Sequence, residues 1–344
     1  MLESVISQET TFNFEFIVAD DGSSDKTRDI INEYAERYPE IIKPIFREKN
    51  MGAWSNFIDA LRQAKGDYIA LCEGDDYWID NEKLQKQVDF LDKNPDYVIC
   101  FHKARVVYEG DEKEETYPDV EDPDWYNLKE LLSINYIPTA SVMYRKQDYS
   151  ALAPEMMPGD WYLHVYHAKF GKIKIINDVM SVYRKHKNGI WWDYDANRDR
   201  IWRKYGLSYM RLYTSFLDMI KDMPAEYSDI VKTEIFNLLM NIARVDKKFD
   251  DDRLNEALNE YPSYSLPFMY FASESYERKS VESDNYRDEL LKVGDERATL
   301  RLELAKEQQE LETLRHELSV IKKSVSWKIL KAGSSAYKKV KRKK

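Results

Sequence analysis

Apolar residues in the first 190 positions fall into short runs that are separated by stretches with helical spacing. The helical stretches between the early runs are Thr27–Tyr38, Ala53–Ala64 and Glu82–Lys93. This alternation is typical of an α/β sandwich with mostly parallel strands. The runs predicted to be strands are Phe14–Ala19, Ile41–Phe46, Asp67–Cys72, Tyr97–Val107, Ile137–Tyr144 and Lys172–Tyr183.

The pattern changes near residue 193, where helical periodicity covers Arg198–Lys221 and Tyr227–Val245. From Leu290 to Ile321, apolar residues recur at spacings of three and four, which predicts a coiled coil that would join copies of the chain. A single helix packed on its own domain is the alternative. The predicted parts are an α/β domain over 1–192, a helical region over 193–283, a coiled coil over 284–321 and a basic amphipathic tail over 322–344.

The beginning of the chain departs from the pattern of the domain that follows. Leu2–Gln8 has the spacing of the end of an amphipathic helix, and the first strand comes only at Phe14. Because α/β domains of this kind normally open with a buried strand, we expect an upstream strand and half a helix to precede Met1 in the natural gene product. A variant fold that opens with a short helix is the alternative.

Charge is distributed unevenly along the 344 residues. The net charge is −10, yet residues 322–344 hold ten Lys and Arg and no acid, so the preceding part carries −20. An acidic body argues against nucleic-acid binding. The two cysteines, Cys72 and Cys100, exclude a disulfide scaffold and favour a reducing compartment. No signal-peptide pattern or apolar run of ~20 residues is present, which predicts a cytoplasmic protein.

The tail combines its basic residues with Trp327, Ile329 and Leu330. Apolar and aromatic residues beside a polybasic stretch favour binding to an anionic membrane surface, at about 1 kcal/mol per basic residue near it. We therefore expect peripheral attachment to the inner face of a membrane. A solvated tail is the alternative.

Two predicted strands end in acidic turns. Asp20 and Asp21 follow the first strand, at the edge where open α/β sheets bind ligands, and a carboxylate there can accept bonds from a nucleobase or a ribose. Glu73, Asp75 and Asp76 follow the third strand. Carboxylates that crowd together repel unless a cation neutralises them, which favours Mg²⁺ or Mn²⁺ bridging to phosphates. Ordinary turns and a solvated acidic loop are the alternatives.

Two further positions are candidates on weaker grounds. Asp160 lies between a turn and a helical stretch, where it suits either a general base or a helix N-cap. Arg184 and His186 follow the last strand and suit a diphosphate or its metal.

Six motifs in order make the chain resemble the family 2 inverting glycosyltransferases of the GT-A fold over about residues 1–192. They are VADDGSSDKT, REKNMGAWSNF, GDYIALCEGDDYW, IPTASVMYR, PGDWYLH and SVYRKH. The resemblance implies a Rossmann-like nucleotide-diphospho-sugar transferase domain. It also implies direct displacement at the anomeric carbon, with a nucleotide-sugar donor such as a UDP-sugar and a glycan or lipid-linked glycan acceptor in cell-surface polysaccharide synthesis.

The resemblance also implies roles for individual residues. Asp20 and Asp21 map to the nucleotide site, and Asn50 and Gly52 to a turn near the donor. Glu73-Gly74-Asp75 stands where the family has its DxD element, so Asp75 becomes the best metal ligand, with Asp76 in support. His186 maps to a position near the diphosphate or metal. Asp160 is the remaining acid of the family's acid-Asp pair and the expected base.

Two other functions are alternatives to sugar transfer. A truncated, inactive paralogue that acts as a coiled-coil scaffold at the membrane is the main alternative, because the family's first strand, which cups the nucleobase, is missing here. A sugar-nucleotide nucleotidyltransferase would need a glycine-rich basic loop near its start, and the sequence has none there.

Overall fold

The computed structural model describes residues 1–119, 121, 126–187, 189, 192, 198–272, 309–315 and 319. The chain forms two compact units. Unit 1 comprises Met1–Tyr194 and Arg211–Val231, and unit 2 comprises Asp195–Met210 and Lys232–Lys344. The predicted coiled coil and basic tail lie outside the described residues, apart from the helical positions 309–315 and 319.

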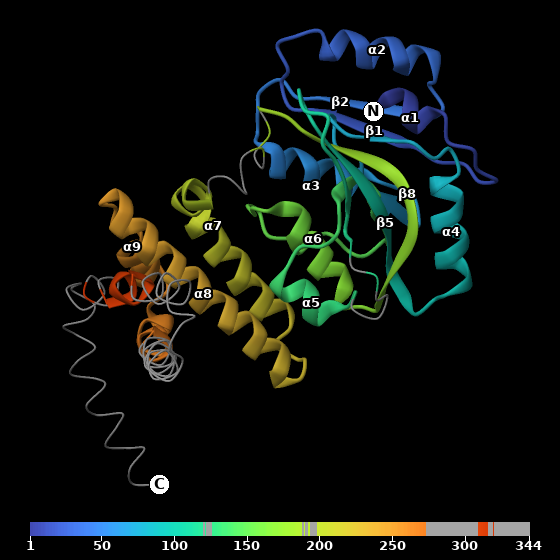
Figure 1. Cartoon of the computed structure of the whole chain (residues 1–344). Helices are drawn as coiled ribbons and strands as arrows, with labels where there is room; N and C mark the ends of the chain where they lie inside the picture. The colour runs from blue at the N-terminus through green and yellow to red at the C-terminus, as the bar shows by residue number, and fades with distance from the viewer. Residues whose placement is uncertain are drawn as a thin grey trace, which may run out of the picture. The chain divides into compact units, whose positions relative to one another are not determined.

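A two-stranded parallel sheet forms the first part of unit 1. Here β1 (Phe16–Asp20) pairs with β2 (Ile42–Phe46) along its whole length. The helices α2 (Thr27–Arg37) and α3 (Ala53–Gln63) lie on opposite sides of this pair (Figure 1), and the short α1 (Leu2–Ile6) precedes it. The chain therefore leaves the sheet at Asp20 and enters the turn that leads to α2.

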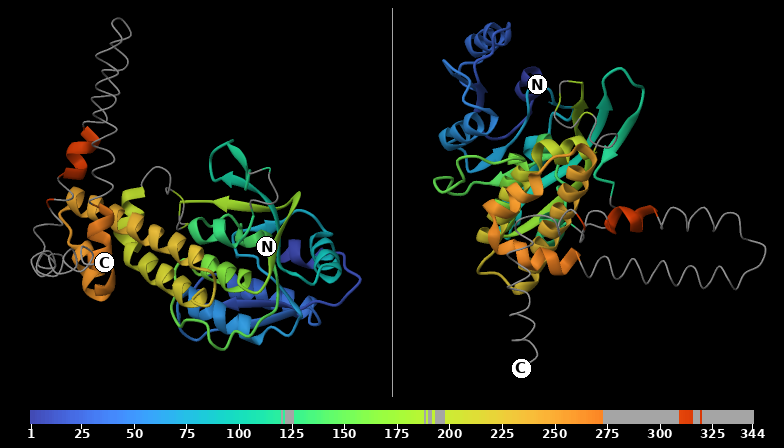
Figure 2. Two further views of the ribbon diagram at one scale, coloured as in Figure 1. Left: turned by 90° about the horizontal axis from the view of Figure 1, so that it is seen from below. Right: turned by 90° about the vertical axis from the view of Figure 1, so that its left-hand side faces the viewer.

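A six-stranded sheet forms the second part of unit 1. Its order is β3-β7-β5-β8-β4, and β6 pairs with β5 as a hairpin that projects from the sheet in both views of Figure 2. The central β5 and β8 are long and parallel, and Val98–Phe101 is buried as a continuous run because helices such as α4 cover the sheet. The strands are β3 (Tyr68–Ala70), β4 (Tyr77–Trp78), β5 (Tyr97–Tyr108), β6 (Glu114–Tyr117), β7 (Met143–Arg145) and β8 (Lys172–Lys185).

The prediction of mostly parallel strands is wrong. The pairings β3–β7, β5–β7, β5–β6 and β4–β8 are antiparallel, and only β1–β2 and β5–β8 are parallel among the described strands. The short connection between β5 and β6 permits only antiparallel pairing, and β7 enters between β3 and β5 and runs antiparallel to both. The predicted strand Ile137–Tyr144 is also shorter than expected, because η2 (Thr139–Ser141) occupies its middle and the strand begins at Met143.

Three helices cover the six-stranded sheet or extend from it. They are α4 (Lys83–Lys93), α5 (Leu128–Ser133) and α6 (Gly159–Ala168). Every residue of α6 from Trp161 to Val165 is buried, so this helix lies within the core of unit 1 rather than on its surface. Its first turn is thereby held in a fixed place, which matters for the acid that it carries.

The predicted helices after residue 193 are confirmed as α7 (Arg198–Met219) and α8 (Ala225–Phe249), followed by α9 (Arg253–Glu260), η3 (Pro262–Tyr264) and a helical stretch over 265–272. Within unit 2, Asp199 accepts hydrogen bonds from Arg244 and Lys248, each at 2.6 Å. In the part of the chain that the structure describes, no helix combines the length and apolar character needed to cross a bilayer.

Candidate active site

The turn after β1 separates its two acids. Asp20 is buried and accepts hydrogen bonds from the backbone of Gly22 and Ser23 and from Arg28 Nε at 2.7 Å. Burial alone would raise the pKa of Asp20, but these hydrogen bonds outweigh burial and lower it. The carboxylate of Asp20 is thus engaged within its own turn and orders it.

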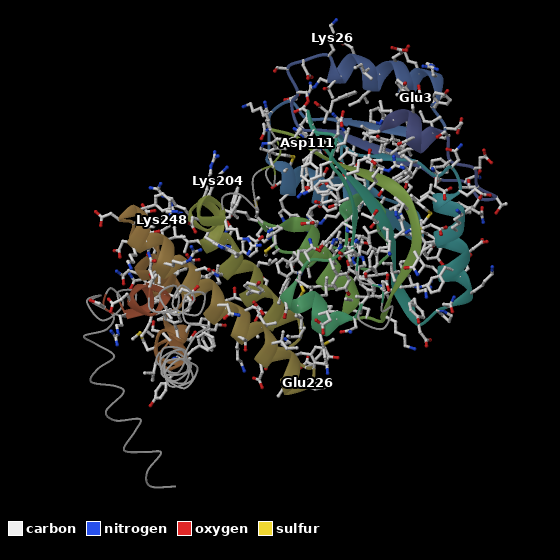
Figure 3. All side chains as sticks on the ribbon, viewed as in Figure 1. Glu3, Lys26, Asp111, Lys204, Glu226 and Lys248 are labelled. Carbon is white, nitrogen blue, oxygen red and sulfur yellow. The ribbon has the colours of Figure 1, made fainter. Side chains whose placement is uncertain are left out.

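Asp21 faces the neighbouring turn instead. Its two oxygens accept hydrogen bonds from the backbone N–H groups of Met51 at 2.8 Å and Gly52 at 3.0 Å. Asn50 Oδ1 also accepts a bond from the N–H of Gly52, whose φ of 91° favours glycine. The structure therefore brings together Asp21, Asn50 and Gly52, three of the residues predicted to bind the donor. Lys26, the residue directly before α2 at the end of the turn that follows β1, is labelled in Figure 3.

The second acidic turn lies beside the end of β8, because β4 pairs with β8 in antiparallel register. His186 Nε2 is 2.9 Å from Asp75 Oδ2, and the Asp75 side chain keeps 46% of its surface exposed. Asp76, by contrast, is buried, and its Oδ1 accepts the backbone N–H of Arg184 at 2.9 Å. Burial raises the pKa of Asp76 to about 7. Asp75 and His186 are accordingly the accessible pair.

Asp160 is the second residue of α6 and is not its N-cap, since Pro158 holds that position. The Nδ2 of Asn135 donates to Asp160 Oδ2 at 2.9 Å, and Thr139 Oγ1 lies 3.5 Å from the same oxygen. Burial raises the pKa of Asp160 above its ordinary value, while these polar contacts work in the opposite direction. A carboxylate whose pKa is raised in this way suits proton abstraction.

Glu73 links the second acidic turn to Asp160. The side chain of Glu73 is still exposed to solvent. Partial desolvation by the surrounding protein, together with the nearby negative charge of Asp160, raises the pKa of Glu73 to about 8. Thr139, which also approaches Asp160, donates a hydrogen bond to Glu73. The predicted base and the predicted metal loop are therefore neighbours, although 84 residues separate Asp160 from Asp76 in the sequence.

A divalent metal fits this donor set. Among the residues that the structure describes, no three His, Cys, Asp or Glu side chains are placed to hold an ion by themselves. Asp75 and His186 offer one oxygen and one nitrogen side by side. Mg²⁺ and related ions are commonly held by one or two protein ligands together with substrate phosphates, so the pair suits an ion that arrives with a nucleotide.

The sequence analysis missed several residues of the site. Asn135 and Thr139 lie in a mostly apolar stretch of the sequence. The single amide of Asn135 in that stretch was the feature that could have pointed to the site. Asn56 is buried behind the first turn, where its side chain donates to Ala19 O and accepts from Arg47 Nε. Trp54, at the start of α3, packs against the first turn of α6. Each of these residues is joined to the site by contacts between segments that are distant in the sequence.

Gly159, directly before Asp160, is required by Trp54. A Cβ at position 159 would lie 2.3 Å from Trp54 Cε3. The indole cannot move easily, because its Nε1 donates to Ala153 O at 2.9 Å and its ring meets Tyr162 edge-on at 5.6 Å. We predict that Gly159→Ala lowers the free energy of unfolding by about 1–3 kcal/mol, the usual cost of overpacking, as measured by urea denaturation.

Gly74→Ala is the matched control, because a Cβ there meets nothing within 4 Å. The double variant Trp54→Leu/Gly159→Ala should lose less stability than the sum of its single changes, since the clash is removed. Equal unfolding curves for Gly159→Ala and Gly74→Ala would contradict this account of the contact.

The first part of the chain is similar to a known protein family. Residues 1–152 match the family model described as Glycosyl transferase family 2. An uncharacterized protein of Mycobacterium tuberculosis is 43% identical over 220 residues, which is 64% of this chain and 64% of that protein. The chain thus spans less than two thirds of the length of this relative.

Two further similar proteins are named for an activity. An Escherichia coli protein named UDP-Glc:alpha-D-GlcNAc-diphosphoundecaprenol beta-1,3-glucosyltransferase is 40% identical over 91 residues, 26% of this chain and 34% of that protein. The mannosyltransferase PcManGT from Pyrobaculum calidifontis, solved in complex with GDP-Man and Mn²⁺, has a TM-score of 0.49 and 15% identity, and the match covers 78% of this chain and 77% of that one.

Proposed function

We propose that the protein transfers a sugar from a nucleotide-sugar donor, most simply a UDP-sugar, to a glycan or lipid-linked glycan acceptor of a cell-surface polysaccharide, because residues 1–152 match the model of glycosyl transferase family 2. The observation that supports this most directly is the placement of Asp160 beside the Glu73–Asp76 turn. A base and a diphosphate-binding turn must be neighbours if one bond is to form as the other breaks. The donor and the acceptor in the name of the E. coli relative are of the same classes.

The proposed step is a direct displacement. The acceptor hydroxyl oxygen attacks the anomeric carbon, Asp160 takes the hydroxyl proton, and the bond between that carbon and the diphosphate oxygen breaks. The electron pair of the broken bond leaves with the nucleoside diphosphate. A single displacement inverts the configuration at the anomeric carbon, so no covalent glycosyl-enzyme is required.

Two parts of the site are proposed to hold the donor. We expect the turn of Asn50 and Gly52, which Asp21 holds by two hydrogen bonds, to bind the nucleoside, while Asp20 orders the preceding turn. Glu73 and Arg184 are expected to contact the diphosphate. Asp75 and His186 would hold Mg²⁺ or Mn²⁺, and such an ion stabilises the negative charge that develops on the leaving diphosphate. Asp76 as a further ligand stays a prediction.

Release of nucleoside diphosphate tests the proposal. The full chain is incubated with a panel of UDP-, dTDP- and GDP-sugars and Mn²⁺, with water or short glycans as acceptors, and free nucleoside diphosphate is measured. We expect release from one donor at a rate well above that of the Asp160→Asn variant. No release from any donor, together with no detectable nucleotide binding, would favour the inactive scaffold instead.

The C-terminal tail is proposed to attach the protein to the inner face of a membrane. Deleting residues 322–344 should abolish sedimentation with anionic vesicles, because the ten basic residues of this segment are removed. Binding of the full chain should weaken as the Debye length shrinks from about 10 Å at 0.1 M salt to about 3 Å at 1 M. Trp327→Ala should weaken binding at low salt as well. Equal pelleting of full-length and truncated protein would identify the tail as a solvated extension.

A further inference from the structure

Asn135 makes the shorter of the two hydrogen bonds that side chains donate to the carboxylate of Asp160. It lies between α5 and η2, in a stretch that is otherwise apolar and largely buried. Its Nδ2 donates to Asp160 Oδ2 at 2.9 Å, across 25 residues of sequence. An amide that faces the expected base from a separate segment can set both the position and the proton affinity of that base.

The amide of Asn135 is held in one orientation. Its Oδ1 accepts the backbone N–H of Ile137 at 3.4 Å, which turns Nδ2 toward Asp160. Its own backbone carbonyl accepts a hydrogen bond from Tyr117 Oη at 2.7 Å, so the last residue of β6 anchors the segment. Asn135 is therefore a fixed donor that does not have to be ordered when a substrate binds.

The groups that face Asp160 from the surrounding elements are acidic or neutral near pH 7. They are Glu73 in the turn after β3, Tyr117 on β6, Tyr144 on β7 and Tyr183 on β8, with His164 one turn further along α6 bonded to Tyr144. Burial raises the pKa of Asp160, and hydrogen bonds from the backbone N–H of Trp161 and from the Asn135 side chain oppose that rise. Without the bond from Asn135, less of the carboxylate would be ionised and ready to accept a proton.

We propose that Asn135 is a positioning residue for the base: its amide occupies Asp160 Oδ2, leaves Oδ1 to take the acceptor's proton, and stabilises the ionised carboxylate. This inference rests on the proposed function for its effect on turnover. Its effect on Asp160 itself does not require turnover and is measured separately.

The direct test is the proton affinity of Asp160 in the full chain without substrate. Side-chain carboxyl ¹³C NMR of aspartate-labelled protein gives a titration curve, and the Asp160 signal is the one that Asp160→Asn removes. Asn135→Leu, which has a similar size and no donor, should raise the pKa of Asp160 by about one to two units, the equivalent of a hydrogen bond to a charged group. Ile134→Ala is the matched control, because Ile134 is the exposed neighbour of Asn135.

Kinetics supply the second test. Asn135→Leu should lower kcat for nucleotide release about ten- to hundredfold, shift the acid limb of the pH–rate profile upward, and leave the donor KM within a few-fold. Tyr117→Phe keeps the Asn135 amide and removes the hydrogen bond from Tyr117 Oη to the Asn135 carbonyl. We therefore expect kcat to fall in this variant too, but by less. Asn135→Asp, which places a carboxylate opposite Asp160, should be more severe than Asn135→Leu at neutral pH.

The outcomes separate the two proposals. If the Asp160 titration and the pH–rate profile of Asn135→Leu match the wild type, the positioning role is wrong even though transfer stands. If the wild type releases no nucleotide but the Asp160 titration still shifts, the proposed function fails and the contact stands. Should Asn135→Leu not fold, Tyr117→Phe decides by the same two readouts, and a wild-type result for it would overturn the proposal.

Discussion

Replacing Asp160 with Asn should lower kcat by about 100-fold or more, because the amide keeps the shape of the carboxylate but cannot accept the acceptor's proton. The bond from Asn135 can be retained through the amide oxygen, so donor binding should change little. The wild-type rate should also fall as the pH drops through a value above the ordinary pKa of an aspartate, since burial raises the pKa of Asp160 and the base must be ionised to act. Steady-state kinetics across pH measure both effects.

The free energy of unfolding provides a control for this prediction. A carboxyl whose pKa is raised by folding favours the native state at low pH and disfavours it as the pH rises through that pKa. Asp160→Asn removes this penalty, so its free energy of unfolding at pH 7 should equal or exceed that of the wild type. Asp29→Asn, at an exposed position in the first turn of α2, should leave turnover unchanged and lower stability by no more than about 0.3–1 kcal/mol, the contribution of an acid at a helix N-terminus. Turnover of Asp160→Asn within a few-fold of the wild type would show that another group is the base.

Replacing Asp75 with Ala should abolish metal-dependent nucleotide binding. Asp75 supplies a carboxylate beside His186, and nearly half of its side chain is exposed. Even indirect changes at metal sites weaken metal affinity by about 10- to 100-fold, so loss of a direct ligand should cost at least as much. Calorimetric titration of the full chain with UDP and Mn²⁺, with and without EDTA, measures the effect.

His186→Ala should produce a parallel loss, because the two side chains are 2.9 Å apart and would share one ion. The fold should survive Asp75→Ala, since Asp76 rather than Asp75 holds the buried bond to the backbone of Arg184. Unfolding curves check this point, and Asp29→Ala serves as the substitution control. Full transfer in excess EDTA would exclude the metal site.

Adjacent acids that look alike in the sequence have different environments in the structure. Asp20 is buried and satisfied within its turn, while Asp21 faces the Asn50–Gly52 turn. The same contrast separates Asp76 from Asp75. In both pairs the strand or turn geometry directs one side chain into the protein and its neighbour outward. The motif marks the pair, but the roles within each pair follow from burial.

Local pattern was sufficient for most elements. The helices Thr27–Arg37, Ala53–Gln63 and Lys83–Lys93 and the strand Ile42–Phe46 begin or end within a residue or so of their predicted bounds. These segments have the apolar spacing that suits their own secondary structure, so local preference and tertiary burial agree. The acidic strand ends were predictable for the same reason, because they follow directly from where those strands stop.

Strand direction and the surroundings of Asp160 were not predictable in this way. The apolar run of β5 pairs in parallel with β8 and in antiparallel with β7, so the pattern of one strand does not give the direction of its neighbours. The order β3-β7-β5-β8-β4 depends instead on which faces pack together. The partnership of Asn135 with Asp160 and the fit of Trp54 against Gly159 each join segments 25 or more residues apart. Neither contact produces a periodic pattern in the sequence. Residue type and spacing therefore indicate the family resemblance, most of the elements and the acidic turns. Contacts that form only on folding determine which acid of each pair is accessible, fix the position of Asp160 and leave no room for a side chain at position 159.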